Sequence, residues 1–239
     1  MIDLHSHILP GIDDGAAMMQ DSIRLVKELE SIGVSDIFAT PHYVDETIYV
    51  SPRKDNLKLI DELQREIDKE GISVRLHLGN EVYITPRILQ LVSEGEISTL
   101  GDTKNILVEL PMSGEFPGYR DIMLELIRSG YHVILAHPER YSAFMSDYSL
   151  ILDLHEMGVD FQCNLGSFAG QYGRGVFKLA RRLAKEKMIW GMGSDIHHVH
   201  PGLLENGKKK LARFYTEDEL NEILVNNPKK ILLAESDAD

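Results

Sequence analysis

Short apolar runs alternate with longer amphipathic stretches along the whole chain, and this alternation restricts the possible folds more than any other feature of the sequence. An apolar or β-branched run followed by apolar residues at three- and four-residue spacing is typical of a strand–helix unit, and repeated units build a parallel sheet. The sequence therefore predicts an α/β fold. We predict seven strands, at 1–7, 34–40, 74–80, 105–110, 132–137, 160–165 and 188–194.

The helices predicted between and after these strands have clear boundaries. Three amphipathic stretches lie at 21–33, 53–71 and 119–130. Residues 216–234 predict a closing helix that begins with a Thr216 cap, breaks at Pro228 and continues as a last short helix.

Length, charge and cysteine content exclude several classes of protein. A chain of 239 residues without a Pro/Ser-rich linker or a repeat leads us to expect a single domain over 1–239. The formal net charge of −13 argues against nucleic acid as a partner, because Lys and Arg supply most of that affinity. A single cysteine, Cys163, excludes an intrachain disulfide and a Cys-rich zinc site.

The sequence also bears on location. No apolar run approaches the roughly 18–20 residues that span a bilayer, and the N-terminal MIDLHSH does not resemble a signal sequence. We therefore expect a cytoplasmic protein without membrane insertion.

Histidines and carboxylates follow six of the seven predicted strands. In a closed parallel barrel the carboxyl ends of all strands open on one face, so we expect these side chains to converge there. They are His5, His7, His42, Glu81, Glu109, His137, Asp195 and His197, with either Asp13 or Asp14 from the loop after the first strand.

This set of side chains is typical of a site for divalent cations. His5 and His7 are spaced by two, so strand alternation places both imidazoles on the same side. Nine ligands exceed the roughly three to six that one cation takes, which predicts two or three cations with a bridging carboxylate such as Glu81. Imidazole and carboxylate ligands without thiolate suit Mn²⁺ or Fe²⁺ and permit Zn²⁺.

The charge of the site favours a phosphorylated substrate. Four carboxylates packed together would carry about −4 and repel phosphate, whereas three divalent cations would change the balance to about +2. Divalent cations also lower the pKa of water and stabilise both oxygens of an in-line displacement. We therefore predict hydrolysis of a phosphate ester.

Six motifs, in this order, carry a resemblance to a known family: DLHSHILPGIDDG, TPH, GNEVYITP, VELP, AHPERY and GSDIH. They are similar to the motifs of the polymerase-and-histidinol-phosphatase (PHP) superfamily. More narrowly, they resemble the bacterial manganese-dependent protein tyrosine phosphatases encoded with capsule and exopolysaccharide genes, the CpsB/YwqE group. The resemblance extends to the segment 227–232 and implies a PHP fold, which is a distorted (β/α)7 TIM-like barrel, with three Mn²⁺ ions.

The resemblance also implies a ligand set for each ion. The first ion would have His5, His7, Glu81 and Asp195; the second Glu81, Glu109 and His137; the third Asp14, His42 and His197. Asp14 is implied in place of Asp13 because the second aspartate of the DDG motif is the family's ligand.

Arg140, three residues after His137, matches a family arginine that the resemblance implies in phosphate binding. A guanidinium there would donate hydrogen bonds to phosphate oxygens and stabilise charge in the transition state. A second basic residue of the family has no clear equivalent, and either His200 or the Lys208–Lys210 run is a candidate.

The resemblance implies a metal-dependent protein-tyrosine phosphatase whose partner is the phosphotyrosine-bearing tail of a cognate bacterial tyrosine kinase that controls capsular or exopolysaccharide synthesis. Two alternatives stay open. Histidinol-phosphate phosphatase uses the same chemistry on a small alkyl ester, and a PHP domain can also be a non-catalytic metal-binding module.

Overall fold

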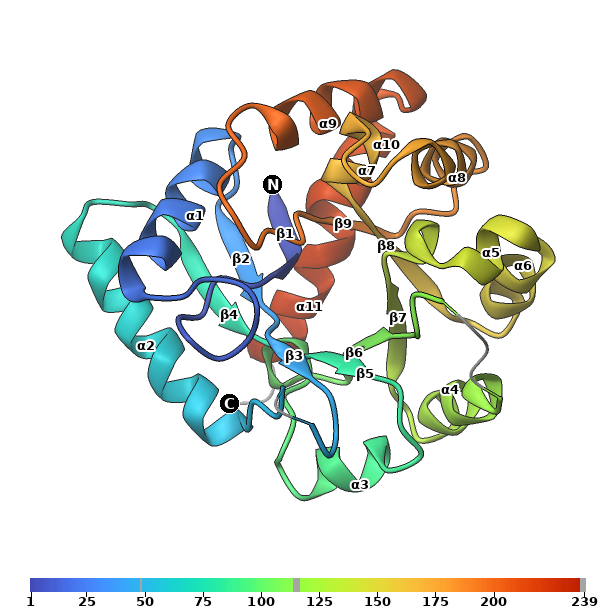
Figure 1. The fold of residues 1–239 in the computed structure, drawn as a ribbon, viewed down its shortest axis with the longest axis horizontal. Coiled ribbons are helices and arrows are strands. Elements are labelled where there is room, and N and C mark those ends of the chain that lie inside the picture. The colour runs from blue at the N-terminus through green and yellow to red at the C-terminus, as the bar shows by residue number, and fades with distance from the viewer. Residues whose placement is uncertain (48, 114–116, 237–239) are drawn as a thin grey trace.

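The computed structural model of the protein describes residues 1–47, 49–113 and 117–236. Strands lie at the centre of these residues and helices surround them (Figure 1). Every described strand pair is parallel. The strands are β1 (Ile2–Ser6), β2 (Asp36–Ala39), β3 (His42–Tyr43), β4 (Arg75–Leu78), β5 (Glu81–Tyr83), β6 (Asn105–Glu109), β7 (His132–Ala136), β8 (Asp160–Asn164) and β9 (Gly191–Gly193).

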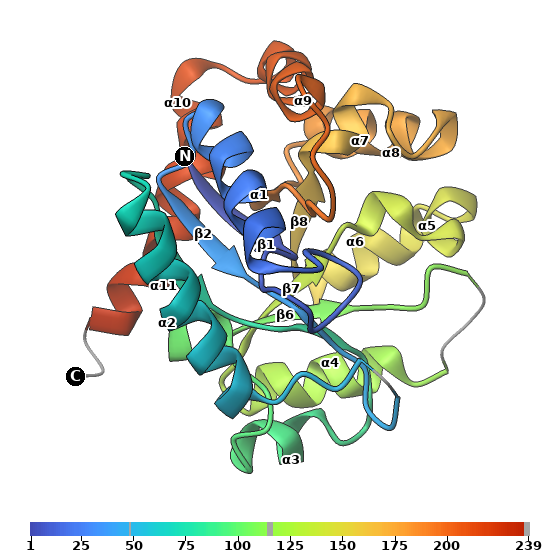
Figure 2. The ribbon, with the colours of Figure 1, turned by 60° about the vertical axis from the view of Figure 1, so that its left-hand side comes forward.

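The helices form the outer layer, and α1 and α2 lie side by side over β1 and β2 (Figure 2). The α-helices are α1 (Met19–Ser31), α2 (Arg53–Lys69), α3 (Ile88–Ser93), α4 (Tyr119–Arg128), α5 (Ser142–Ser146), α6 (Ser149–Glu156), α7 (Leu165–Ala169), α8 (Arg174–Lys185), α9 (Leu203–Leu211), α10 (Glu217–Asn221) and α11 (Asn227–Ser236). Shorter turns are η1 (Leu100–Asp102), η2 (Pro138–Arg140), η3 (Ala212–Phe214) and the π-helical η4 (Glu222–Asn226).

The strands curl into a distorted barrel, as predicted. One sheet has the order β1-β2-β4 and the other the order β3-β5-β6-β7-β8-β9. The first strand meets the last beyond the end of β9, where Ser6 forms a parallel bridge with Ile196. There the Asp195 amide donates to the His5 carbonyl at 2.8 Å and the His7 amide donates to the Ile196 carbonyl at 3.2 Å.

The predicted second and third strands are each followed by a short strand that the sequence analysis missed. β3 begins after Pro41, which has no amide hydrogen to donate to a neighbouring strand. β5 begins after Gly79 and Asn80; Gly79 packs so closely on Leu100 that an added Cβ would lie 2.7 Å from Leu100 Cδ2. The Asn80 side chain donates to the Pro41 carbonyl at 3.0 Å, which links the residue before β5 to the residue before β3.

The closing helix begins as predicted, because Thr216 caps α10 in a reciprocal capping box with Glu219. The predicted break at Pro228 is wrong. The chain stays helical through the π-helical turn η4, and Pro228 is the second residue of α11. Proline has no amide hydrogen for the i→i−4 ladder, and the π-helical turn before Pro228 already departs from that ladder.

Two apolar clusters hold the barrel together. The larger lies between the strands and the surrounding helices. The smaller joins Leu4, Leu107 and Ile134 from three strands to Ile231 of α11. No helix among the described residues is both long and apolar enough to cross a membrane.

Candidate metal centre

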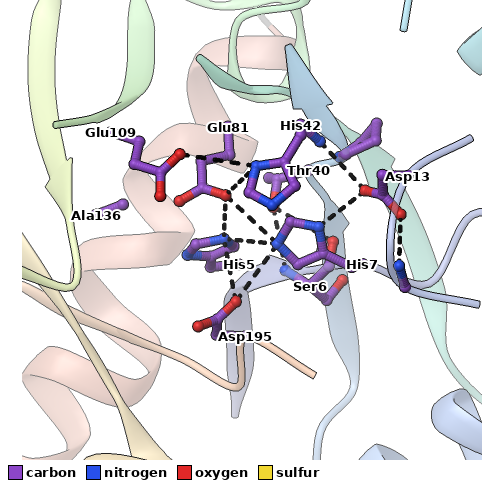
Figure 3. A network of polar contacts seen from close by, with 12 residues as sticks. His5, Ser6, His7, Asp13, Thr40, His42, Glu81, Glu109, Ala136 and Asp195 are labelled. Carbon is purple, nitrogen blue, oxygen red and sulfur yellow. Dashed lines mark hydrogen bonds and ion pairs between the residues drawn. The ribbon is translucent and has the colours of Figure 1, made fainter. Parts of the chain in front are cut away.

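The barrel brings all nine candidate ligands together at one face, and Figure 3 shows six of them pointing toward one another. β1, β3, β5 and β6 carry four of the nine, and five more lie in segments that follow β1, β7 and β9. The four are His5, His42, Glu81 and Glu109, and the five are His7, Asp14, His137, Asp195 and His197.

One oxygen of Glu81 lies at the middle of this group. Glu81 Oε2 is 3.3 Å from His5 Nε2, 3.5 Å from His7 Nε2 and 2.9 Å from His42 Nδ1. This buried oxygen nevertheless has no hydrogen-bond partner within the described residues, and neither has His42 Nδ1. His5 Nε2 and His7 Nε2 are themselves only 3.0 Å apart. Buried lone-pair donors that crowd around one point, some of them without a hydrogen-bond partner, are what a shared cation would satisfy.

Glu109 and His137 lie on the other side of Glu81. His137 Nε2 is 2.8 Å from Glu81 Oε1 and 3.9 Å from Glu109 Oε1. Burial, together with the negative charges of Glu81 and Asp195, raises the pKa of Glu109 to about 9. Burial opposes ionisation of Glu81 too, but the imidazoles of His5 and His42 outweigh it and lower the pKa of that carboxyl. Without cations the centre therefore takes up protons, as closely packed carboxylates must.

A third group lies nearer the solvent. Asp14 Oδ1 is 3.2 Å from His197 Nε2 and 3.5 Å from His42 Nε2. The hydrogen bond with His197 lowers the pKa of Asp14 to about 2. His197 Nδ1 donates to the Asp195 carbonyl at 3.0 Å, so Nε2 is the nitrogen that faces Asp14 and that would bind a cation there.

The two aspartates of the DDG motif have different partners in the structure. Asp13 Oδ2 accepts hydrogen bonds from His7 Nδ1 at 2.8 Å and from the His42 amide at 3.2 Å, and Asp13 Oδ1 accepts from the Gly15 amide at 2.9 Å. A carboxylate behind a metal-ligating imidazole fixes the ring orientation and raises its basicity. Asp13 is thus placed to orient His7, while Asp14 faces the imidazoles of His42 and His197.

Three groups of side chains have ligand atoms within 4.8 Å of one another. They are His5, His7 and Glu81; His42, Glu81 and Glu109; and His7, Asp14, His42 and His197. These groups overlap the three implied ligand sets, with His7 and His42 each belonging to two groups. Their nitrogen and oxygen donors fit Mn²⁺, Fe²⁺ or Zn²⁺.

Asp195 joins the centre to Arg140. Its Oδ1 lies 3.4 Å from His7 Nε2, whereas its Oδ2 accepts from Arg140 Nη1 at 2.5 Å and from Asn164 Nδ2 at 2.7 Å. The Arg140 guanidinium also stacks 4.5 Å from the centre of the Tyr172 ring. Arg140 therefore lies at the edge of the centre with its position fixed on two sides.

β8 has no candidate ligand but supports two of them with amides. Gln162 Oε1 accepts from His5 Nδ1 at 2.9 Å, and Gln162 Nε2 donates to Asn164 Oδ1 at 2.8 Å. Gly193 leaves room for this contact, since an added Cβ would lie 2.5 Å from Gln162 Nε2. The sequence analysis missed Gln162, Asn164 and the role of Asp13, although the two amides show the same spacing by two as His5 and His7.

Two residues of the centre have left-handed backbone conformations. His137 has φ of 33° and Asp195 has φ of 51°. Such conformations are uncommon outside glycine and cluster at functional sites, where surrounding contacts hold them. His137 directly follows β7 and Asp195 is the second residue after β9, and the unusual backbone turns their side chains toward the centre.

A pocket of about 360 Å³ opens beside the centre. Its walls include Arg140, Tyr172, His200 and Leu203. Of the two candidates for a second basic group, only His200 lies here. Within the run Lys208–Lys210, the first and last lysines donate to backbone carbonyls and the middle one pairs with a glutamate of α9.

Other reactive side chains have structural surroundings. Cys163 is buried in β8, and burial raises the pKa of its thiol. His77 contacts Asp36 at 3.1 Å, and His132 contacts Asp160 at 2.7 Å, both away from the centre.

Comparison with known proteins places this chain among proteins of capsule synthesis. The family model described as capsular polysaccharide synthesis, CpsB/CapC, matches residues 1–233. The chain is 31% identical to CapC of Staphylococcus aureus over 92% of this chain and 87% of that protein. It is 32% identical to the tyrosine-protein phosphatase YwqE of Bacillus subtilis over 92% of this chain and 82% of that protein.

Solved structures agree with these relatives. The fold matches a crystal structure from work on YwqE of Bacillus subtilis and CpsB of Streptococcus pneumoniae, described as unique metal-dependent tyrosine phosphatases, with a TM-score of 0.90 and 29% identity over 98% of this chain and 95% of that one. A histidinol phosphate phosphatase from Lactococcus lactis shares the fold at a TM-score of 0.59 and 12% identity, over 89% of this chain and 93% of that one. The chain therefore belongs to the CpsB/CapC family of capsular polysaccharide synthesis proteins.

Proposed function

We propose that this protein is a metal-dependent protein-tyrosine phosphatase that binds three divalent cations, with Mn²⁺ as the physiological metal. The observation that carries the proposal is the convergence of nine imidazole and carboxylate side chains, with Glu81 at their middle. The ligand sets are those implied by the sequence, with His5, His7, Glu81 and Asp195 on the first ion, Glu81, Glu109 and His137 on the second, and Asp14, His42 and His197 on the third.

The residues around the centre fit hydrolysis of an aryl phosphate. The cations, when bound, lower the pKa of water toward neutrality and neutralise the phosphoryl oxygens. Arg140 keeps one nitrogen on Asp195 and has further N–H groups for a phosphate oxygen in the adjoining pocket. A tyrosine phenolate has a pKa of about 10, so it leaves more readily than an alkoxide and needs less help from a general acid.

The pocket also bears on the histidinol-phosphate alternative. A small amino alcohol phosphate needs a spare carboxylate for its ammonium group. Within the described residues, the carboxylates that line this pocket are Asp14 and Asp195, and both already face imidazoles or Arg140. The lining thus favours a substrate without a cation near its phosphate. The physiological substrate that we propose is the phosphotyrosine-bearing tail of a cognate bacterial tyrosine kinase that controls capsular or exopolysaccharide synthesis.

Phosphate release by chelator-stripped protein tests the proposal. The protein would receive Mn²⁺, Zn²⁺ or Mg²⁺ in turn, with a phosphotyrosine peptide and histidinol phosphate as parallel substrates. We expect Mn²⁺ to restore release from the peptide alone. Release from histidinol phosphate would assign the chain to the biosynthetic reaction, and release from neither would favour a non-catalytic metal-binding module.

A further inference from the structure

The charge of the chain is strongly segregated. Residues 174–213 hold ten Lys and Arg against three Asp and Glu, a formal charge of +7, whereas the rest of the chain carries −20 of the total of −13. This segment contains α8 and α9, which both pack against α7 at the rim of the barrel (Figure 1). An acidic protein with one basic region presents that region to an anionic partner.

Part of this basic segment forms a groove with aromatic walls, which we call the α8–α9 groove. It has a volume of about 370 Å³ and is lined by Phe177, Arg181, Lys210, Arg213 and Phe214. The Arg181 guanidinium lies 5.4 Å from the centre of the Phe177 ring and 5.8 Å from that of Phe214. Within the described residues neither Arg181 nor Arg213 forms an ion pair. Two guanidinium groups without an ion pair, one of them beside two aromatic rings, suit a ligand that combines negative charge with an aromatic or extended peptide surface.

The groove is within a short peptide's reach of the metal centre. Leu203 lines the pocket beside the centre and Lys210 lines the groove. Both are on α9, seven residues apart, which puts them on the same side of the helix and about 10 Å apart. Gly207 of α9 packs on the backbone of Leu165 in α7 between them, so a peptide would pass around α7 rather than along α9, and an extended peptide needs at least about three residues for this distance.

The turn between α7 and α8 connects the two sites as well. Tyr172, in this turn, lines the pocket beside the centre, and Phe177, in the first turn of α8, lines the groove. Lys210 reaches across to the Ala169 carbonyl at the end of α7, at 3.5 Å. A peptide leaving the pocket over this turn would meet the groove next.

We propose that the α8–α9 groove binds a second anionic group of the peptide substrate, a phosphotyrosine or an acidic residue three or four positions from the phosphotyrosine under hydrolysis. The inference rests on the proposed function, because it uses the same substrate. An anionic membrane is the less suited partner, since the basic groups lie in a concave groove between aromatic rings rather than on a flat face. The groove would thus select multiply phosphorylated or acidic tyrosine segments.

Peptide kinetics with matched substrates test this proposal. Peptides with one phosphotyrosine would carry Ala, Glu or a second phosphotyrosine three or four positions away, on either side. We expect the anionic peptides to have a KM about tenfold lower with unchanged kcat, because the groove binds ground state and transition state alike. Arg181→Glu combined with Arg213→Glu should remove the difference, while turnover of free phosphotyrosine reports the state of the metal centre.

A charge-matched control variant and two binding measurements separate the possible explanations of the result. Lys54→Glu with Lys229→Glu, on α2 and α11, changes the net charge equally and should keep the peptide preference. Anisotropy with labelled phosphonate analogues of the peptides measures docking even if phosphotyrosine is not hydrolysed, so the proposed function can fail separately. Equal KM and affinity for all peptides would overturn the inference, as would binding of phosphatidylglycerol vesicles that needs Arg181 and Arg213 while peptide kinetics do not.

Discussion

At the scale of single residues, Asp195 connects the metal centre to the phosphate-binding side of the site. Its two oxygens face opposite ways, one toward His7 and one toward Arg140 and Asn164. The carboxylate is buried, and although burial opposes ionisation, the charge of His5 and the contacts of the neighbouring cationic groups hold its pKa well below the usual range. Asn164 holds Asp195 in place as well as Arg140 does. A substitution of Arg140 should therefore lower turnover of the substrate more than it lowers the metal content.

Arg140→Ala tests that division of roles. We expect kcat for a phosphotyrosine peptide to fall by about a hundredfold or more, since a donor to the charge that develops in the transition state is lost. Metal content should persist, because Asn164 still holds Asp195. Steady-state kinetics with elemental analysis measure both quantities. Unchanged turnover would remove Arg140 from the mechanism, and Arg140→Lys, which keeps charge without the planar fork, should retain part of the activity.

The aspartates of the DDG motif provide a matched pair of variants. Asp14→Ala removes a proposed ligand, so we expect a loss of about one cation per chain at saturating Mn²⁺. Asp13→Ala removes no proposed ligand but removes the acceptor of His7 Nδ1 and of the Gly15 and His42 amides, so we expect full occupancy at saturation with an affinity about 10–100-fold weaker. Elemental analysis and Mn²⁺ titration distinguish these outcomes. The reverse pattern would exchange the roles of the two residues.

At the scale of elements, the sequence predicts the strands well where burial on both faces leaves continuous apolar runs, as in β6 and β7. It misses β3 and β5, because strands of two and three residues with His42 and Glu81 at their starts have no apolar run to detect. The same residues are nevertheless found as candidate ligands, since polar groups that follow a strand stand out. β8 is the opposite case, a predicted strand whose functional residues are not predicted. Gln162 and Asn164 contact the centre only through His5 and Asp195, which are distant in sequence.

A substitution in β8 tests whether that strand positions ligands. In Gln162→Leu the acceptor of His5 Nδ1 is lost, and we expect Mn²⁺ affinity to fall about 10–100-fold, whereas Gln162→Glu should restore much of it. Asn227→Leu is the control, because it removes another buried amide, one that donates to the Trp190 carbonyl at the far end of β9. Thermal unfolding of all three variants reports general damage. An equal loss of affinity in the control would attribute the effect to stability alone.

At the scale of the whole molecule, the barrel explains why ligands spread over nearly 200 residues meet at one point. Parallel strands deliver their carboxyl ends to the same face, and the bridge between Ser6 and Ile196 brings the first and last of them together. That convergence is predictable from the order of strands and polar residues. The pairing of Arg140 with Asp195 and the groove between α8 and α9 are not, because they depend on how turns and helices pack at the rim.

The central proposal is that nine side chains, Glu81 among them, hold three divalent cations. Crystals of the Mn²⁺-loaded protein, with anomalous diffraction recorded at the manganese edge, test it most directly. The account predicts three manganese peaks per chain, one contacted by His5 and His7, one by Glu109 and His137, and one by Asp14 and His197, with Glu81 between the first two. A single peak, or peaks away from these side chains, would contradict it.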